Sequence, residues 1–268
     1  MNAISLGKAY LGAALLLLAL TACATTPGGW GKDATLTPGW KRVGDAAVHA
    51  VTSPFSWAPV AAAIALRYDH ADENLQEWAG SRTPLFGSTR DADQMSDNFL
   101  HAGGALWLLS GLAATDISGE GLAGNVTALG VETGAGIATR SYVGIRKDIT
   151  QRRAPNGVDR EGFPSGHITE AALFATLASR HVDAYGWSSG AETAADIGLG
   201  ALVAATAWAR IEADQHYPTD ALGSIAIGHA IGLFVSEAFI GTDNPRNIVF
   251  LAGPVPGGGG AATLSFDF

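Results

Sequence analysis

Apolar residues along the chain gather in six stretches with the spacing of α-helices. Each stretch is rich in alanine, glycine and leucine, and small residues of this kind let helices approach one another closely. The pattern therefore predicts an all-α fold, a compact bundle of about six helices. The predicted helices cover residues 57–68, 97–115, 120–143, 167–182, 192–211 and 219–240.

The first 22 residues have the arrangement of a secretion signal. Lys8 precedes the apolar run from Leu11 to Leu20, and small residues follow it. The sequence Leu20-Thr21-Ala22-Cys23 resembles the bacterial lipobox, in which the cysteine is lipidated and becomes the new N-terminus. We therefore predict a lipoprotein signal peptide over residues 1–22 and a lipid on Cys23, the single cysteine of the chain. An ordinary signal peptide with a chance cysteine is the alternative.

This anchor predicts a protein of the bacterial cell envelope that faces the periplasm. Ala24 follows the cysteine, which by analogy with lipoproteins favours the outer membrane. A membrane-spanning helix needs about 20 nearly uncharged apolar residues, and charges interrupt most of the predicted helices. The most apolar run, Ala221 to Phe239, still contains His229 and Glu237. We expect a soluble bundle attached by its lipid, with a bundle lying partly in the bilayer as the alternative.

The remaining segments differ in composition from the helices. Residues 23–45 contain Pro-Gly pairs and predict a tether, and the polar stretch 70–96 predicts a surface excursion pinned by Trp78, Pro84, Leu85 and Phe86. Residues 243–268 hold two apolar runs around a glycine-rich turn, which predicts a short C-terminal β-hairpin extension. The main domain is accordingly expected over residues 46–242.

Net charge and histidine spacing narrow the function classes. The formal net charge of −9 is opposite to the basic surface that nucleic-acid binding needs, so a nucleic-acid partner is not expected. Neither a metal nor a cofactor is expected, since Gly134-x-Gly136 lacks the third glycine of a dinucleotide site. Nor does a metal-ligand spacing such as His-Glu-x-x-His join the scattered histidines His49, His70, His101, His181 and His229.

Two short motifs contain residues suited to binding and attacking an anion. In Pro164-Ser165-Gly166-His167, the proline suits the first turn of a helix, which places Ser165 and Gly166 at a helix N-terminus. Free backbone amides and the helix dipole favour an anion there. In the segment Arg210 to Asp220, Pro218 requires a helix to begin nearby, so that His216 precedes this helix and Asp220 lies one turn inside it.

The motifs, in this order, resemble those of the PAP2 family (type 2 phosphatidic acid phosphatase, vanadium haloperoxidase-like). The family pattern is Lys-x6-Arg-Pro, then Pro-Ser-Gly-His, then Ser-Arg-x5-His-x3-Asp. Residues 164–167 match the second block completely, and residues 210–220 match the third with Ala209 in place of its serine. Lys147 and Pro155 match the first block, but Ala154 stands where the family has its arginine.

The resemblance implies a catalytic mechanism. His216 would attack phosphorus and form a phosphohistidine, Asp220 would hold its ring, and His167 would protonate the leaving oxygen. The phosphoryl oxygens would be surrounded by Lys147, Ser165, Gly166 and Arg210. Arg152 or Arg153 is the candidate substitute for the arginine missing at Ala154.

The predicted function is therefore a metal-independent phosphatase. Its substrate would be a lipid phosphate or diphosphate, or a small phosphomonoester. The alternative is a non-catalytic envelope lipoprotein that keeps the fold as a scaffold or binding module. Ala154 and Ala209 support this alternative, whereas the retained histidines oppose it.

Overall fold

The structure is a computed structural model that describes residues 29–115, 121–157, 161–241, 248–254 and 260–266. The bundle is all-α, as predicted. Cys23 and the signal peptide lie outside the described residues, so the lipid anchor stays a prediction. The helices are α2 (Trp40–Thr52), α3 (Pro54–Leu66), the 3-10 turn η1 (Tyr68–His70), α4 (Ala71–Arg82), α5 (Thr89–Ala114), α6 (Leu122–Thr150), α7 (Gly166–Asp183), α8 (Ser189–Glu212), α9 (Pro218–Val235) and the π-helical turn η2 (Ser236–Ile240).

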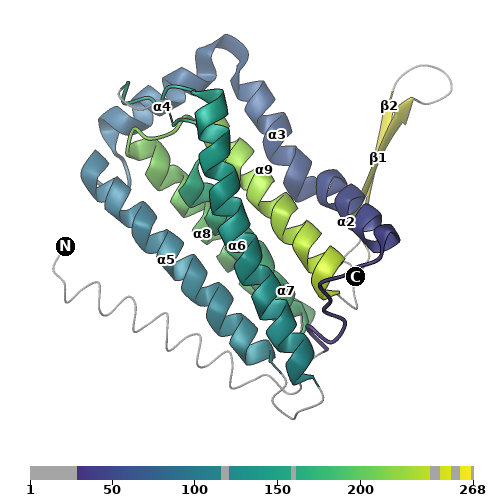
Figure 1. Ribbon diagram of the computed structural model, residues 1–268. Helices are drawn as coiled ribbons and strands as arrows, with labels where there is room; N and C mark the ends of the chain where they lie inside the picture. Colours follow the sequence, from purple (N-terminus) through teal and green to yellow (C-terminus); the bar gives the residue numbers. More distant parts are fainter. Residues whose placement is uncertain (1–28, 116–120, 158–160, 242–247, 255–259, 267–268) are drawn as a thin grey trace.

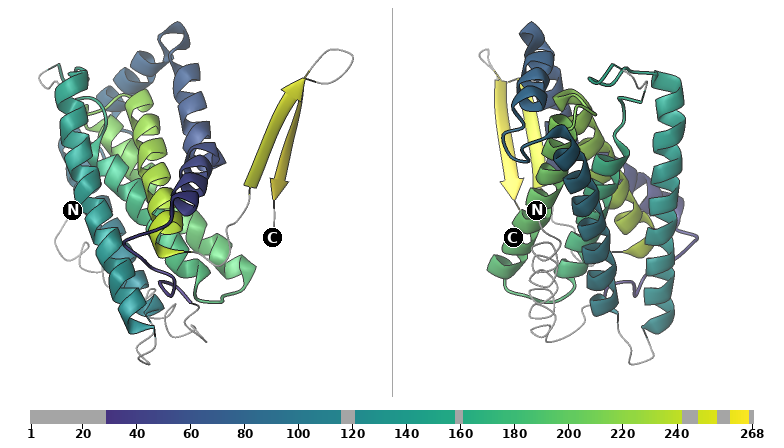
Figure 2. Two further views of the ribbon diagram at one scale, coloured as in Figure 1. Left: turned by 45° about the vertical axis from the view of Figure 1, so that its right-hand side comes forward. Right: turned by 90° about the vertical axis from the view of Figure 1, so that its left-hand side faces the viewer.

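Helix α7 forms the centre of the bundle. It packs against α5, α6, α8 and α9, and most of its side chains are buried. Figures 1 and 2 show α5 and α6 running along the length of the bundle, with α2 and α3 beside α9. Small residues bring α7 and α9 together: a side chain at Gly228 would lie 2.2 Å from the Thr169 carbonyl oxygen. The close helix packing that the small residues predicted is therefore present between α7 and α9.

The sequence pattern did not predict two of the helices, α2 and α4. Helix α2 begins inside the predicted tether, and α4 occupies the predicted surface excursion. The side of α4 that faces the bundle is partly polar, because Asp72 and Gln76 are buried there with hydrogen bonds to Thr219 and Asp214. An apolar period cannot reveal a helix whose buried side chains are polar.

The excursion is also pinned differently from the prediction. The side chain of Leu85 is exposed, and its backbone amide and that of Phe86 donate hydrogen bonds to the buried carboxylate of Glu212. Trp78 is half-exposed and lies against Trp208, with 6.2 Å between the ring centroids. Glu212 therefore holds this segment through its backbone.

The outer side of α2 and α3 is apolar and exposed. Trp40 is 91% exposed, Phe55 63% and Ile64 69%. Separately, α8 and the run Pro218–Ile240 are the two described helices that are long and apolar enough to cross a membrane. Core helices of soluble proteins meet the same criterion, and half of the second segment's most apolar window is buried in the bundle.

Two strands follow the bundle. β1 (Ile248–Pro254) and β2 (Gly260–Phe266) pair antiparallel, with Ile248 opposite Phe266 and Pro254 opposite Gly260. The connection between them, residues 255–259, lies outside the described residues. The C-terminal hairpin and the domain boundaries at 46 and 242 therefore stay predictions.

Candidate functional site

The motif residues come from four helix ends at one end of the bundle. Lys147 lies in the last turn of α6 and Arg210 in the last turn of α8. His167 lies in the first turn of α7, and His216 just before α9. Helix α4 packs on the same end through its contacts with α8 and α9 (Figure 1). Residues separated by up to 69 positions in the sequence therefore come to the same end of the bundle.

The N-terminus of α7 is open. Ser165 is its N-cap, but the Ser165 hydroxyl makes no capping bond, is fully buried and has no partner among the described residues. The first helical hydrogen bond runs from the amide of Thr169 to the Ser165 carbonyl, so the amides of residues 166–168 have no helical acceptor. Pro164 precedes the cap, which corrects its predicted place in the first turn. This end of α7 offers several donors to an anion.

The N-terminus of α9, in contrast, is closed by carboxylates of the chain itself. The Tyr217 amide donates to Asp220 Oδ2 at 3.0 Å. The Thr219 amide and hydroxyl donate to Asp72 at 2.8 and 2.6 Å. An anion entering the site therefore meets the free amides of α7.

His216 is held by a backbone carbonyl. Its Nδ1 lies 2.8 Å from the Gly162 carbonyl oxygen, and the side chain is almost completely buried. Because a carbonyl can only accept, Nδ1 carries the proton and Nε2 keeps its lone pair. Burial, followed by the charges of Arg210, Lys147 and His167, lowers the pKa of His216 to about 3 although the Gly162 bond opposes this. His216 is thus a neutral imidazole with an unprotonated Nε2.

Asp220 does not hold the His216 ring, which corrects the expected role. Its Oδ1 lies 3.0 Å from Arg152 Nε, and its Oδ2 caps α9. Burial raises the pKa of the Asp220 carboxyl to about 7, against the opposing effects of Arg152 and the Tyr217 amide. The sequence spacing does place a carboxylate one turn after His216, but this carboxylate accepts a hydrogen bond from the Tyr217 amide at the cap of α9.

Arg210 and Lys147 supply the cationic side of the site. The Arg210 side chain is buried; its Nη1 donates to Asp93 and, at 3.3 Å, to Ser96, whereas its Nε has no partner among the described residues. Lys147 pairs with the exposed carboxylate of Glu161 at 2.9 Å. Both cations lie near enough to His216 to lower its pKa.

His167 has a carboxylate partner that the sequence did not reveal. Its Nε2 lies 2.7 Å from Asp97 Oδ1. Burial and the charge of Arg210 lower the pKa of His167, while Asp97 and Asp93 act in the opposite direction. Both aspartates are on α5; their spacing of four residues, which places them on one helix face, was the available signal.

Comparison with known families agrees with this arrangement. Residues 129–240 match the model of the PAP2 superfamily, a segment that includes Lys147, His167, His216 and Asp220. This part of the chain is therefore similar to the PAP2 superfamily. The chain is also similar to the solved structure of the first transmembrane PAP2 type phosphatidylglycerolphosphate phosphatase from Bacillus subtilis, with 21% identity and a TM-score of 0.49. That similarity covers 67% of this chain and 94% of the other. No curated protein sequence matches the chain significantly.

The missing PAP2 arginine at position 154 is not replaced by Arg152. Arg152 pairs with both Asp72 and Asp220, and its guanidinium lies 5.2 Å from the centre of the Tyr217 ring. Arg153 makes no hydrogen bond or ion pair with the described residues, so its substitution for the arginine stays a prediction. Ala154 itself is 4% exposed, which leaves no open space for a longer side chain.

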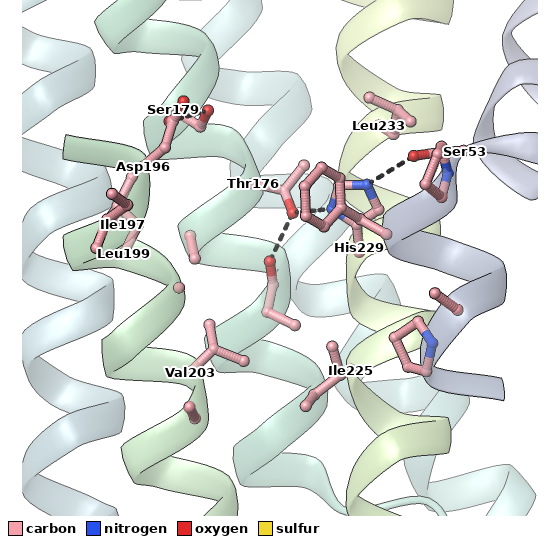
Figure 3. A pocket seen from close by; sticks show the side chains of 18 of the residues that line it. Ser53, Thr176, Ser179, Asp196, Ile197, Leu199, Val203, Ile225, His229 and Leu233 are labelled. Atoms are coloured by element: carbon pink, nitrogen blue, oxygen red, sulfur yellow. Dashed lines mark hydrogen bonds between the residues drawn. The ribbon is translucent and has the colours of Figure 1, made fainter. Parts of the chain in front are cut away.

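A cavity of about 990 Å³ lies elsewhere in the bundle. It is lined mostly by apolar side chains of α3, α7, α8 and α9 and contains none of the motif residues (Figure 3). In its wall, the ring nitrogens of His229 lie 2.9 Å from the Thr176 hydroxyl and 3.3 Å from the Ser53 hydroxyl. Burial lowers the pKa of His229 to about 4, so this histidine is a neutral wall residue.

Proposed function

We propose that the chain is a metal-independent phosphatase that works through a phosphohistidine on His216. The proposal depends on one observation. Two buried donors without a partner among the described residues, the Ser165 hydroxyl and Arg210 Nε, occur in the same site as a neutral His216. A buried polar atom is normally paired, so unpaired donors beside a nucleophile support a site for an anionic group.

The amides at the start of α7, with Ser165, Arg210 and Lys147, would bind the phosphoryl oxygens. The Arg210–Asp93 and Lys147–Glu161 pairs have half-exposed or exposed carboxylates. A phosphoryl group can therefore replace these carboxylates as the partner of each cation. Positioning and charge stabilisation of this kind supply most of the catalysis in phosphoryl transfer.

The reaction would proceed in two steps. His216 Nε2 forms a bond to phosphorus as the ester P–O bond breaks, and His167 gives its proton to the leaving oxygen. Water then attacks the phosphohistidine, passes a proton to His167, and releases phosphate with neutral His216. Atoms and protons balance over the cycle, which requires His167 to be protonated at the start.

Phosphate release tests the proposed activity. We expect the purified protein to release phosphate from at least one class among lipid phosphates, isoprenyl diphosphates and small phosphomonoesters. Excess EDTA should leave the rate unchanged, and vanadate should inhibit by occupying the anion site. If none of these substrates is hydrolysed, or if His216→Ala hydrolyses them equally fast, the chain is the non-catalytic scaffold instead.

We propose that the chain is a lipoprotein of the cell envelope, anchored through Cys23 and facing the periplasm, in the outer membrane. The lipobox resemblance supports the anchor, and only 16 residues separate Cys23 from the exposed Trp40 at the start of α2. A lipid-anchored enzyme would meet lipid phosphates at the membrane surface. Substrates of this class are therefore favoured over soluble esters.

Replacing the anchoring cysteine is expected to release the protein from membranes. Wild type should sediment with membranes and incorporate labelled palmitate, whereas Cys23→Ala should lose the label and appear in the soluble periplasmic fraction. Each CH₂ of an acyl chain that enters the bilayer contributes about 0.8 kcal/mol to membrane binding. Equal sedimentation of unlabelled Cys23→Ala would show that another surface, such as the outer side of α2 and α3, holds the protein.

A further inference from the structure

Two aspartates of α5 border the site without belonging to any motif. Asp93 and Asp97 are one helical turn apart, and both side chains are about half-exposed. Asp93 pairs with Arg210, and Asp97 lies 2.7 Å from His167. Helix α5 precedes the segment 129–240 that matches the superfamily model. Neither residue is therefore part of the pattern from which the site was assigned.

We propose that Asp97 is a positioning residue that orients the His167 ring and holds a proton on it for the leaving group. This inference rests on the proposed function. The catalytic dyad expected between His216 and Asp220 is absent, and a histidine–aspartate pair is present at the other histidine instead. The carboxylate of Asp97 thus binds His167, the histidine that must be protonated. The neutral carbonyl of Gly162 binds His216, whose Nε2 must be unprotonated.

The ring nitrogens of His167 then have different tasks. A carboxylate only accepts, so Nε2 carries a hydrogen that it donates to Asp97. In the protonated ring, Nδ1 carries the second hydrogen, and this is the proton that leaves with the alcohol. After transfer, the neutral ring keeps its Nε2–H on Asp97, and Nδ1 accepts a proton from the water that attacks the phosphohistidine. The same division of roles operates in a Ser-His-Asp triad, where the carboxylate fixes one nitrogen and the other moves the proton.

Opposing charges surround this ring. Burial and Arg210 of α8 lower the His167 pKa, and Lys147 of α6 is a further cation of the site that acts on His216. His216, which precedes α9, is neutral. Asp93 and Asp97 of α5 are the groups that favour the charged ring. Because Asp93 is already bonded to Arg210, loss of Asp97 removes the direct stabilisation of protonated His167.

The Asp97→Asn variant tests the pairing through the His167 titration. Ring NMR signals would be followed against pH, with His167→Gln identifying the resonance. We expect a lower His167 pKa in Asp97→Asn than in wild type, and an unchanged one in Asp148→Asn. Asp148 is an exposed carboxylate of α6 at the same end of the bundle, so the control matches the change in charge. An unchanged titration in Asp97→Asn would overturn the proposal.

Leaving-group dependence tests the catalytic consequence. A poor leaving group, such as the alcohol of an alkyl phosphate, needs the proton, whereas p-nitrophenolate departs without it. We expect Asp97→Asn to lower kcat/KM for the alkyl phosphate on the order of tenfold to hundredfold at pH 7 and for p-nitrophenyl phosphate much less. Equal losses on both substrates would indicate a structural role and overturn the inference. If wild type hydrolyses none of the lipid phosphates, isoprenyl diphosphates and small phosphomonoesters, the proposed function fails, while the titration still decides whether Asp97 and His167 interact.

Discussion

His216→Ala is expected to lower kcat/KM for phosphate ester hydrolysis by at least about 10³-fold, since the nucleophile and its covalent intermediate are lost together. A rapid quench with ³²P-labelled substrate should trap an acid-labile, base-stable phosphoprotein in wild type and none in the variant. His101→Ala removes an exposed histidine of α5 and should retain the wild-type rate. A variant at His216 that still formed the phosphoprotein would exclude this residue as the nucleophile.

The pH profile separates the two histidines. With its pKa lowered to about 3, His216 stays unprotonated between pH 7 and pH 5 and should cause no loss of kcat/KM in that interval. The general acid is lost as pH rises through the His167 pKa, which lies below its usual value. For an alkyl phosphate we therefore expect kcat/KM to fall as the pH rises from 5 to 7. A decrease in kcat/KM when the pH is lowered from 7 to 5 would contradict this assignment.

The second large effect is on stability. Glu132, His181 and Ser110 form a fully or almost fully buried polar network. His181 Nε2 lies 3.0 Å from Glu132 Oε1, and its Nδ1 lies 2.7 Å from the Ser110 hydroxyl. Trp107 donates a further hydrogen bond to Glu132 at 2.7 Å. A carboxylate with this burial is tolerated only because its partners are in place.

Glu132→Ala is expected to lower the free energy of unfolding by about 3–5 kcal/mol, since it leaves the buried ring of His181 and the partly buried indole N–H of Trp107 without their acceptor. Urea unfolding measures the loss. His181→Ala in the same network should not add fully to it.

Glu77→Ala, on an exposed position of α4, should change stability by no more than about 0.5 kcal/mol. His181 lies 14 positions after His167 on α7, about 20 Å along the helix. Folded Glu132→Ala should therefore retain wild-type kcat/KM. A loss below 1 kcal/mol would contradict the stabilising role of the network.

The sequence alone determined that the fold is helical and where the two helices that carry the site motifs, α7 and α9, begin. Apolar periodicity located the six long helices, and Pro218 began α9 at the expected position. Ser165 and Gly166 lie at a helix N-terminus as predicted, because Pro164 before them restricts the backbone regardless of what packs around it. These features depend on residues close together in the chain.

Only the tertiary structure decided which groups the polar side chains of the site bind. Helix α4 escaped detection because its buried Asp72 acquires its partners from Arg152 and from Thr219, which is 147 positions away. The two carboxylate oxygens of Asp220 bind the cap of α9 and Arg152. His216 is bound by the Gly162 carbonyl instead, and His167 is paired with a carboxylate of α5. Spacing identifies which residue types can act, but a side chain bonds to the nearest available group. That group is set by how helices distant in sequence pack together.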